Sequence, residues 1–480
     1  MLALLNFQKL KSILFKDSAI PYIIAFICIG LFAVNFWLFY PGYIMTDWII
    51  LMAYWGMDNH YPIMYVVLLK WLSDIFGRHL YMPLFFNLIP FYLGLFALCL
   101  GGWKRFHSKW CFLFLLPIFL GNVFFNNIML HSSISSSMFV FLLWSLVLYQ
   151  ILVGITNKNM ICLIIAFIFT ILSRHNALIQ VYPIFFIYSY LIIKQMKQSH
   201  IWAKYIGLLI FFALFTIFSA LGLSSLLKKG TSYPENHILL HQIAGACVPN
   251  NDDTCFKREW YLYGKNYSDV VKTYENNKLN ADNMSAQWIA SRPFKTGKLK
   301  GLKIAWLKAI IKYPRAYFVH VRRYISTMWR SDNITSITPN HQHYSVYVND
   351  IRWLKTIFLE EELFYKSSLN KTKIYDFLRL ISPCFNTIYF VVLNFILFII
   401  IGILFFRKSN ILLLYVLSSL VSSIAGSFIF CIFSPIPASN YIHPILISTT
   451  MAIIGIIVYF CSPNTTNITT NLIDKKTNKT

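Results

Sequence analysis

Long apolar runs constrain this chain more than any other feature. A helix of about 20 predominantly apolar residues can cross the roughly 30 Å hydrocarbon core of a bilayer. Such runs are expected at 20–40, 82–101, 111–128, 138–155, 161–173, 178–193, 201–224, 385–406, 411–433 and 444–461. With 57% hydrophobic and 12% charged residues, the composition excludes a soluble domain of this length. The sequence predicts an all-α polytopic membrane protein with about ten transmembrane helices.

The distribution of Lys and Arg predicts the orientation, because basic residues are retained on the cytoplasmic side of short connections. With the N-terminus inside, fifteen basic residues fall in cytoplasmic pieces and three, Lys70, Arg78 and Arg174, in short outer connections. Both termini are therefore expected in the cytoplasm. The first apolar run ends without a small-residue cleavage site and is expected to remain as an anchor. The abundance of Asn, Lys, Ile and Phe is typical of an AT-rich bacterial genome, so the bacterial inner (cytoplasmic) membrane is the expected location.

This layout divides the chain into four regions. Residues 1–224 are expected to form an N-terminal transmembrane bundle, and residues 225–384 a mainly helical extracytoplasmic segment. Residues 385–461 supply the C-terminal transmembrane helices, and the polar tail, 462–480, is expected to be a disordered cytoplasmic segment.

The extracytoplasmic segment is strongly basic, with 24 basic and 13 acidic residues. Such a segment attracts anionic headgroups or a phosphate-bearing substrate, although interfacial snorkelling explains the same residues. The remaining basic residues lie mainly in the terminal segments and the connections between apolar runs, where they set the orientation of the spans, so no nucleic-acid partner is expected. From Trp306 to Tyr324, apolar and basic positions alternate at helical spacing, which predicts a helix in the outer interface. Pro314 is expected to kink or divide it.

Two of the nine cysteines, Cys247 and Cys255, flank a turn-rich stretch in the extracytoplasmic segment. In an oxidising compartment they are expected to close a small disulfide loop, with two free thiols as the alternative. The other seven lie in or beside apolar runs, where a thiol behaves as a small hydrophobe.

Polar side chains gather at the outer ends of the apolar runs. A charge near the membrane costs desolvation energy unless it is solvated, paired or used, so these residues are functional candidates. They are Asp47, Asp58 and His60 after the first run, Asn126, Asn127 and His131 after the third, Arg174, His175 and Asn176 between the fifth and sixth, Glu235, His237, His241 and Gln242 after the seventh, and Asn440, Tyr441 and His443 before the tenth. Ordinary alternatives are interfacial histidines and, for Asp47, a structural salt bridge. Arg174 opposes the charge bias and needs an anion, which is a lipid phosphate, a substrate phosphate or Asp47.

Several short motifs resemble one enzyme family. They are Tyr40-Pro41-Gly42 with Asp47, Asp58-Asn59-His60-Tyr61-Pro62, Ser173-Arg174-His175-Asn176-Ala177, Leu239-Leu240-His241-Gln242-Ile243-Ala244, and Trp306 with Tyr313-Pro314-Arg315-Ala316-Tyr317 and His320. In type and order they resemble bacterial membrane glycosyltransferases of the GT-C type, of the family 39-like kind, which use polyprenyl-phosphate sugars. The resemblance implies a GT-C-like fold with the active site on the outer face.

The resemblance also implies a mechanism. A sugar moves with inversion from a polyprenyl-phosphate donor to a glycan, lipid or protein acceptor, and Asp47 acts as the general base. His60 orients Asp47 or the acceptor, and Asp58 helps to bind a divalent cation if one is used; no cofactor is certain. Arg174, with His175, offsets charge on the departing phosphate. The other expected substrate-binding residues are Asn176, His131, His241, Gln242 and Arg322.

The chain departs from the family pattern at three places. Ser135-Ser136-Ser137 stands where relatives often have Lys-Asp, Gln242 where they often have an acidic residue, and Ser439-Asn440-Tyr441 where they have an acidic-aromatic-Arg pattern. These differences leave Asp47 as the main carboxylate. A flippase or transporter of a lipid-linked glycan and an oligosaccharide ligase are the alternative functions, although the middles of the apolar runs are nearly free of the charge that transporters place there.

Overall fold

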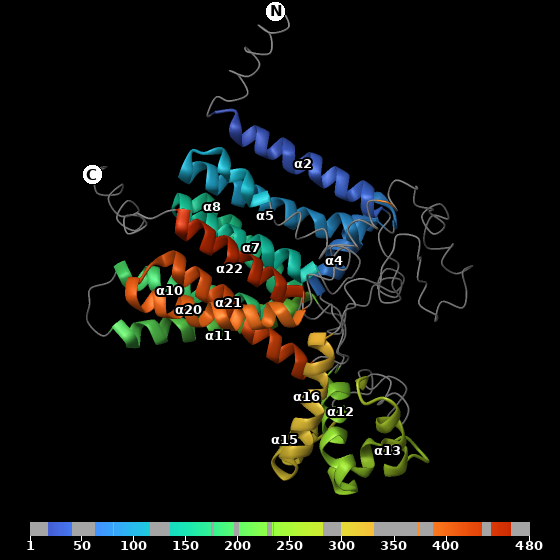
Figure 1. The fold of residues 1–480 in the computed structure, drawn as a ribbon. Helices are drawn as coiled ribbons and strands as arrows, with labels where there is room; N and C mark the ends of the chain where they lie inside the picture. The colour runs from blue at the N-terminus through green and yellow to red at the C-terminus, as the bar shows by residue number, and fades with distance from the viewer. Residues whose placement is uncertain are drawn as a thin grey trace, which may run out of the picture.

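The computed structural model describes residues 18–40, 63–79, 81–115, 135–173, 177–195, 201–227, 233, 235–281, 299–330, 373, 387–433 and 443–461. Regular secondary structure within these residues is entirely helical, as predicted. The helices form a bundle of roughly aligned members and a smaller helical domain that lies at one end of the bundle (Figure 1).

Apolar helices of the bundle coincide with the predicted runs. They are α2 (Ile20–Phe39), α5 (Met82–Phe106), α7 (Ser135–Val153), α8 (Asn157–Ser173), α9 (Ala177–Val181), α10 (Ile184–Gln195), α11 (Ile201–Leu227), α20 (Thr387–Lys408), α21 (Ile411–Phe433) and α22 (His443–Cys461). The predicted run 178–193 is divided into α9 and α10 at Tyr182 and Pro183. The run 111–128 begins in the described 3-10 helix η1 (Lys109–Leu115), and its remainder lies outside the described residues.

Four helices of the described chain are long and apolar enough to cross a membrane: α2, α5, α20 and α21. In the other apolar helices, the residues whose side chains the structure describes form apolar stretches of only 10–17 residues. The protein is thus helical with membrane-spanning segments, and the count of ten spans remains a prediction. The apolar segment after Pro62 forms α4 (Ile63–Phe76), which packs on α5, α8 and α11.

Aromatic and hydroxyl side chains hold the bundle together. The largest buried side chains include Trp144 and Tyr415, whose rings meet edge to face with centroids 5.4 Å apart. Between α20, α21 and α22, the Asn394 amide donates to Ser423 Oγ at 2.6 Å and to Thr449 Oγ1 at 2.8 Å. Small hydroxyl residues allow close helix approach and interhelical hydrogen bonds, the usual means of association between helices in lipid.

The helical domain contains α12 (Glu235–Cys247), α13 (Tyr267–Asn276), α15 (Leu302–Lys312), α16 (Pro314–Arg330) and three short 3-10 helices, η3 (Val248–Asn250), η4 (Asp253–Cys255) and η5 (Arg258–Trp260). It has its own core, which includes Leu240, Ile243, Trp260 and Val270. A capping box starts α13. The Asn266 side chain accepts a backbone N–H from the first turn of the helix, and the Asp269 side chain accepts the backbone N–H of Asn266.

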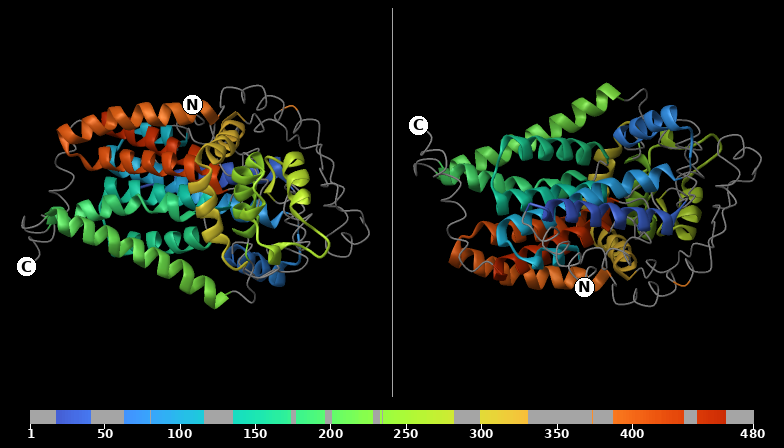
Figure 2. Two further views of the ribbon diagram at one scale, coloured as in Figure 1. Left: turned by 90° about the horizontal axis from the view of Figure 1, so that it is seen from below. Right: turned by 90° about the horizontal axis from the view of Figure 1, so that it is seen from above.

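The predicted interfacial helix is divided at Pro314, as expected, into α15 and α16. Proline is well suited to the first position of a helix and disfavours helical geometry in the residue before it, here Tyr313. The two helices run across the direction of the bundle helices, at the end of the bundle (Figures 1 and 2). Met328 of α16 packs against Cys431 and Ile445, which joins the helical domain to α21 and α22.

Candidate functional site

All three predicted catalytic residues, Asp47, Asp58 and His60, lie outside the described residues. So do four of the predicted substrate-binding residues, His131, Arg174, His175 and Asn176. The structure describes three of the predicted substrate-binding residues, His241 and Gln242 on α12 and Arg322 on α16.

The helices that flank the predicted catalytic segments end on one side of the bundle. Tyr40, after α2, stacks on Tyr81, before α5, with ring centroids 5.8 Å apart. Phe139 near the start of α7 stacks on Phe169 near the end of α8, at 5.6 Å. The start of α22 contacts the end of α21 and α16 through Ile445. This is the side that carries the helical domain (Figures 1 and 2).

A cavity of about 410 Å³ lies in the helical domain, between α12, α13 and the junction of α15 with α16. Its charged lining is entirely basic: Lys312, Arg315 and Arg323. His320 and Tyr274 are buried members of the lining. Basic side chains around a hollow of this size form a site suited to an anionic ligand.

Two buried histidines pack together beside this cavity. His241 of α12 and His320 of α16 are 2% and 3% exposed, and their ring centroids are 4.8 Å apart. His241 Nε2 lies 3.0 Å from the Asn277 carbonyl oxygen, which only accepts, so this nitrogen carries the proton. His241 Nδ1 then accepts from the Tyr324 hydroxyl at 3.3 Å.

His320 has a corresponding tyrosine partner. The Tyr274 hydroxyl lies 3.1 Å from His320 Nδ1, and the positive charge of Arg323 acts on the same tyrosine. Tyr274, His320 and Arg323 all line the cavity, and His320 links the cavity wall to the histidine pair.

Both histidines are held neutral at physiological pH. Burial lowers the pKa of His241 from 6.5 to about 4, and the positive charge of Arg323 acts in the same direction against the Asn277 hydrogen bond. Burial, His241 and Arg323 together lower the pKa of His320 well below its ordinary value. The pair thus serves as neutral donors and acceptors.

Gly245 of α12 makes room for the His320 ring. A Cβ atom at this position would lie 2.9 Å from His320 Cβ and closer still to the ring. We therefore expect Gly245→Ala to lower the stability of the helical domain by about 1 to 3 kcal/mol through overpacking. Hydrogen exchange of α12 and α16 peptides measures this loss. Gly207→Ala on α11, where a Cβ meets nothing within 4 Å, is the control; unchanged protection in Gly245→Ala would contradict the packing.

Gln242 connects three helices through its amide group. Its Oε1 accepts from Trp306 Nε1 at 2.6 Å and from the Tyr317 hydroxyl at 3.2 Å, and its Nε2 donates to the Ile432 carbonyl of α21. Both lone pairs of the oxygen are therefore occupied. With His241 it borders a separate hollow of about 10 Å³, room for about one water. Neither residue lines the larger cavity.

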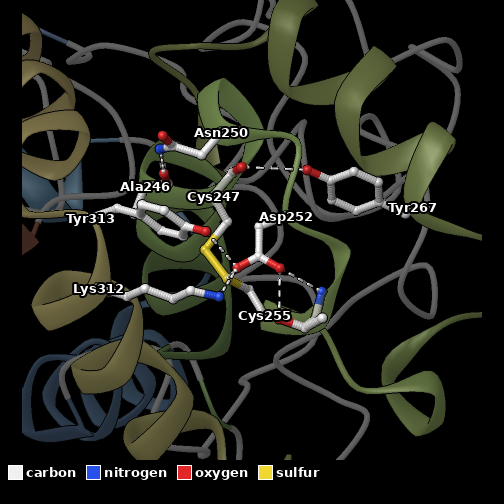
Figure 3. Close-up of a disulfide and its surroundings, with 9 residues drawn as sticks. Ala246, Cys247, Asn250, Asp252, Cys255, Tyr267, Lys312 and Tyr313 are labelled. Carbon is white, nitrogen blue, oxygen red and sulfur yellow. Dashed lines mark hydrogen bonds and ion pairs between the residues drawn. A yellow bond between two sulfur atoms is a disulfide. The ribbon is translucent and has the colours of Figure 1, made fainter.

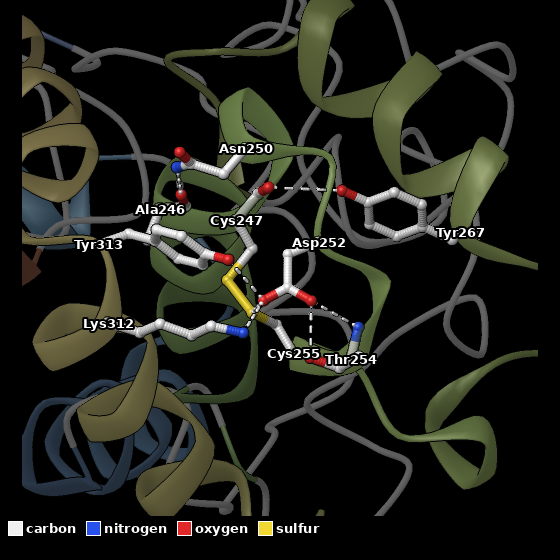
Figure 4. Close-up of polar contacts among 9 residues, drawn as sticks. All are labelled: Ala246, Cys247, Asn250, Asp252, Thr254, Cys255, Tyr267, Lys312 and Tyr313. Atoms are coloured by element: carbon white, nitrogen blue, oxygen red, sulfur yellow. Dashed lines mark hydrogen bonds and ion pairs between the residues drawn. A yellow bond between two sulfur atoms is a disulfide. The ribbon is translucent and has the colours of Figure 1, made fainter.

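The predicted disulfide joins Cys247 to Cys255 (Figure 3). Its loop carries Asp252, whose carboxylate accepts from Lys312 Nζ at 2.8 Å, the Tyr313 hydroxyl at 3.0 Å and Thr254 Oγ1 at 2.6 Å (Figure 4). Burial opposes ionisation, but the hydrogen bonds from Lys312, Thr254 and Tyr313 hold the pKa of Asp252 well below its usual range. The loop thereby fixes Lys312 at the rim of the cavity.

A possible divalent cation was expected near Asp58, which is outside the described residues. Within the described ranges, Cys247, Asp252 and Cys255 are the group of potential metal ligands with close ligand atoms, all within 4.8 Å of one another. Their sulfur atoms are joined in the disulfide and offer no thiolate, and the carboxylate is engaged by Lys312. This group does not fit a metal ion.

Residues that sequence reasoning did not assign to a site make up most of the cavity. Arg322, which was predicted to bind substrate, is exposed and does not belong to the cavity lining, whereas the neighbouring Arg323 does. Lys312 and Arg315 belonged to the predicted amphipathic stretch and His320 to the family resemblance. The basic residues of this stretch could be seen in the sequence. The sequence did not show which face of α16 lines the cavity.

Comparisons of the chain with protein-family models, curated proteins and solved structures found no match.

Proposed function

We propose that this protein is a GT-C type membrane glycosyltransferase, which moves a sugar from a polyprenyl-phosphate donor to a glycan, lipid or protein acceptor. The observation that carries the proposal is the common position of the helix ends. The described helices that lead into and out of the segments with Asp47, Asp58, His60, Arg174 and His443 end on the side of the bundle that carries the basic cavity. Transfer from a lipid-phosphate sugar requires a path for the lipid within the membrane and polar groups at the end of that path.

The chemistry assigns Asp47 to remove the proton of the acceptor hydroxyl. A carboxylate at a partly desolvated membrane mouth has a raised pKa suited to base catalysis. The acceptor oxygen attacks the anomeric carbon, and the bond to the phosphate oxygen breaks. Arg174, with His175, stabilises the negative charge on the departing phosphate. His60 orients Asp47 or the acceptor, and Asp58 contributes to a divalent cation site if the reaction uses one.

The proposed orientation places the helical domain outside the cytoplasm, with ten spans and both termini inside, in a bacterial inner membrane. The asymmetry of basic residues supports this side. The Cys247–Cys255 disulfide supports it independently, because disulfides persist in oxidising compartments and are rare in the cytosol.

Mass spectrometry of surface glycans and lipid-linked sugars, in a deletion strain and its parent, tests the proposal. Accumulation of an unmodified acceptor with unused lipid-linked monosaccharide supports the glycosyltransferase. A complete glycolipid retained on the inner face identifies a flippase instead, and an accumulated lipid-linked oligosaccharide on the outer face identifies a ligase. Unchanged glycans and lipid-linked sugars would contradict all three.

Removal of the Arg174 guanidinium is expected to weaken use of the lipid donor. A charge-assisted hydrogen bond to phosphate is worth about 1.5 to 3 kcal/mol, so Arg174→Ala should lower kcat/KM for the donor by about tenfold to a hundredfold. The measurement is transfer against donor concentration in reconstituted membranes. Arg78→Ala, which removes an exposed charge at the end of α4, is the matched control, and an equal effect of both variants would reject the assignment.

A further inference from the structure

The basic cavity of the helical domain has the features of a headgroup site. Lys312 is engaged by Asp252, whereas Arg315 and Arg323 add two positive charges to a lining that contains no carboxylate. Guanidinium groups match the oxygens of a phosphate with paired, directed N–H donors. Tyr274 and the neutral His320 add polar groups at the buried wall.

The size and the remaining lining of the cavity favour a ligand larger than a single phosphate group. A single phosphate group fills only part of about 410 Å³. Pro314, Ala316 and Val319 add apolar groups to the lining, which suit the carbon atoms attached to a phosphate diester. The ligand expected from these features is anionic and partly apolar.

An apolar surface beside the cavity indicates where such a ligand comes from. On α15 and α16, large apolar side chains are more than half exposed: Ile304, Leu307, Ile311 and Phe318. Exposed Lys303 and Lys308 accompany them on α15. These helices run across the bundle helices at the end of the bundle, the geometry of a helix pair resting on the bilayer surface.

From these features we infer that the cavity between α12, α13 and the α15–α16 junction binds the phosphate headgroup of an anionic lipid that enters from the bilayer along the exposed apolar surface of α15 and α16. This binding does not rest on sugar transfer. A chain that carries Asp47→Asn is expected to bind the lipid as the unchanged chain does.

The test uses the full chain in nanodiscs of phosphatidylcholine with graded phosphatidylglycerol, with retained lipid counted by native mass spectrometry. Arg315→Gln and the double variant Arg315→Gln/Arg323→Gln are expected to lower phosphatidylglycerol retention by about tenfold or more. Arg258→Gln removes the same charge from an exposed position of the helical domain outside the cavity and is expected to retain the lipid. Hydrogen exchange of α12 and α16 confirms that each variant is folded; the exposed position of Arg315 makes its single variant decisive if the double variant unfolds.

Two outcomes would overturn the inference. One is equal retention of phosphatidylglycerol by the unchanged chain, Arg315→Gln and Arg258→Gln. The other is tight binding of inorganic pyrophosphate, abolished by Arg315→Gln, without a preference for phosphatidylglycerol, which would identify a soluble phosphate ligand. A spin label at Ile311 adds an independent readout, since it should be accessible to oxygen in the lipid phase, whereas a label at the exposed Tyr263 should be accessible to aqueous nickel reagents.

Discussion

Replacement of Asp47 by asparagine is expected to lower sugar transfer by about two to four orders of magnitude, the usual contribution of a general base. The amide keeps the shape of the side chain and its hydrogen-bonding capacity but cannot accept the proton of the acceptor hydroxyl. Membrane insertion and donor binding should persist, so the loss should fall on kcat. The measurement is turnover of a lipid-linked sugar by the full chain reconstituted in membranes.

A matched carboxylate is available as a control for this prediction. Asp74 on α4 is exposed and pairs with Lys70 at 2.9 Å, a surface contact that contributes at most about 1 kcal/mol. Asp74→Asn should therefore leave transfer unchanged. Near-normal turnover by Asp47→Asn would remove the base assignment while leaving the membrane fold intact.

Acidification is expected to destabilise the helical domain selectively. His241 has a pKa of about 4 in the folded protein and 6.5 unfolded, so the unfolded chain binds more protons between these values. The stabilisation is complete above pH 6.5 and is lost as the pH falls towards 4. At about 1.4 kcal/mol for each pH unit, His241 alone accounts for about 3 kcal/mol, and His320 acts in the same direction.

Groups around the histidine pair reinforce the expected pH effect. The pair faces Tyr274 and Tyr324, and the positive charge of Arg323 opposes an added proton. Hydrogen exchange of α12 and α16 peptides, corrected for intrinsic rates at pH 7 and 4.5, measures the loss against α5 as an internal reference.

Two variants separate the histidine pair from other titrating groups. His241→Gln cannot ionise and should reduce the pH dependence, whereas the exposed His107→Gln should not alter it. Equal protection of α12 at both pH values in the unchanged chain would refute the prediction.

The helical character of the fold was predictable from local pattern. Most of the predicted apolar runs coincide with described helices, four of them long enough to cross a membrane, because helix formation in lipid depends mainly on the segment itself. Pro314 divides its helix for the same local reason, since proline lacks the backbone donor. The Cys247–Cys255 disulfide loop was also predictable from the sequence, because its eight-residue separation and its turn residues are local features.

The cavity was not predictable, because it depends on the relative rotation of packed helices. Arg322 and Arg323 are adjacent in the sequence, yet only Arg323 lines the cavity. That choice is set by contacts of α16 with α12, including the place that Gly245 leaves for His320. His241 and His320 lie far apart along the chain, and their pairing follows from tertiary packing that no short motif encodes.

The amide of Gln242 has a mechanical consequence. The Gln242 amide hydrogen-bonds Trp306 and Tyr317 on one side and the Ile432 carbonyl on the other. These bonds tie the helical domain to the end of α21. A ligand that tilted α15 by even a small amount would pull on the last turn of a membrane helix. A single side chain thus links the position of α15 to the end of α21.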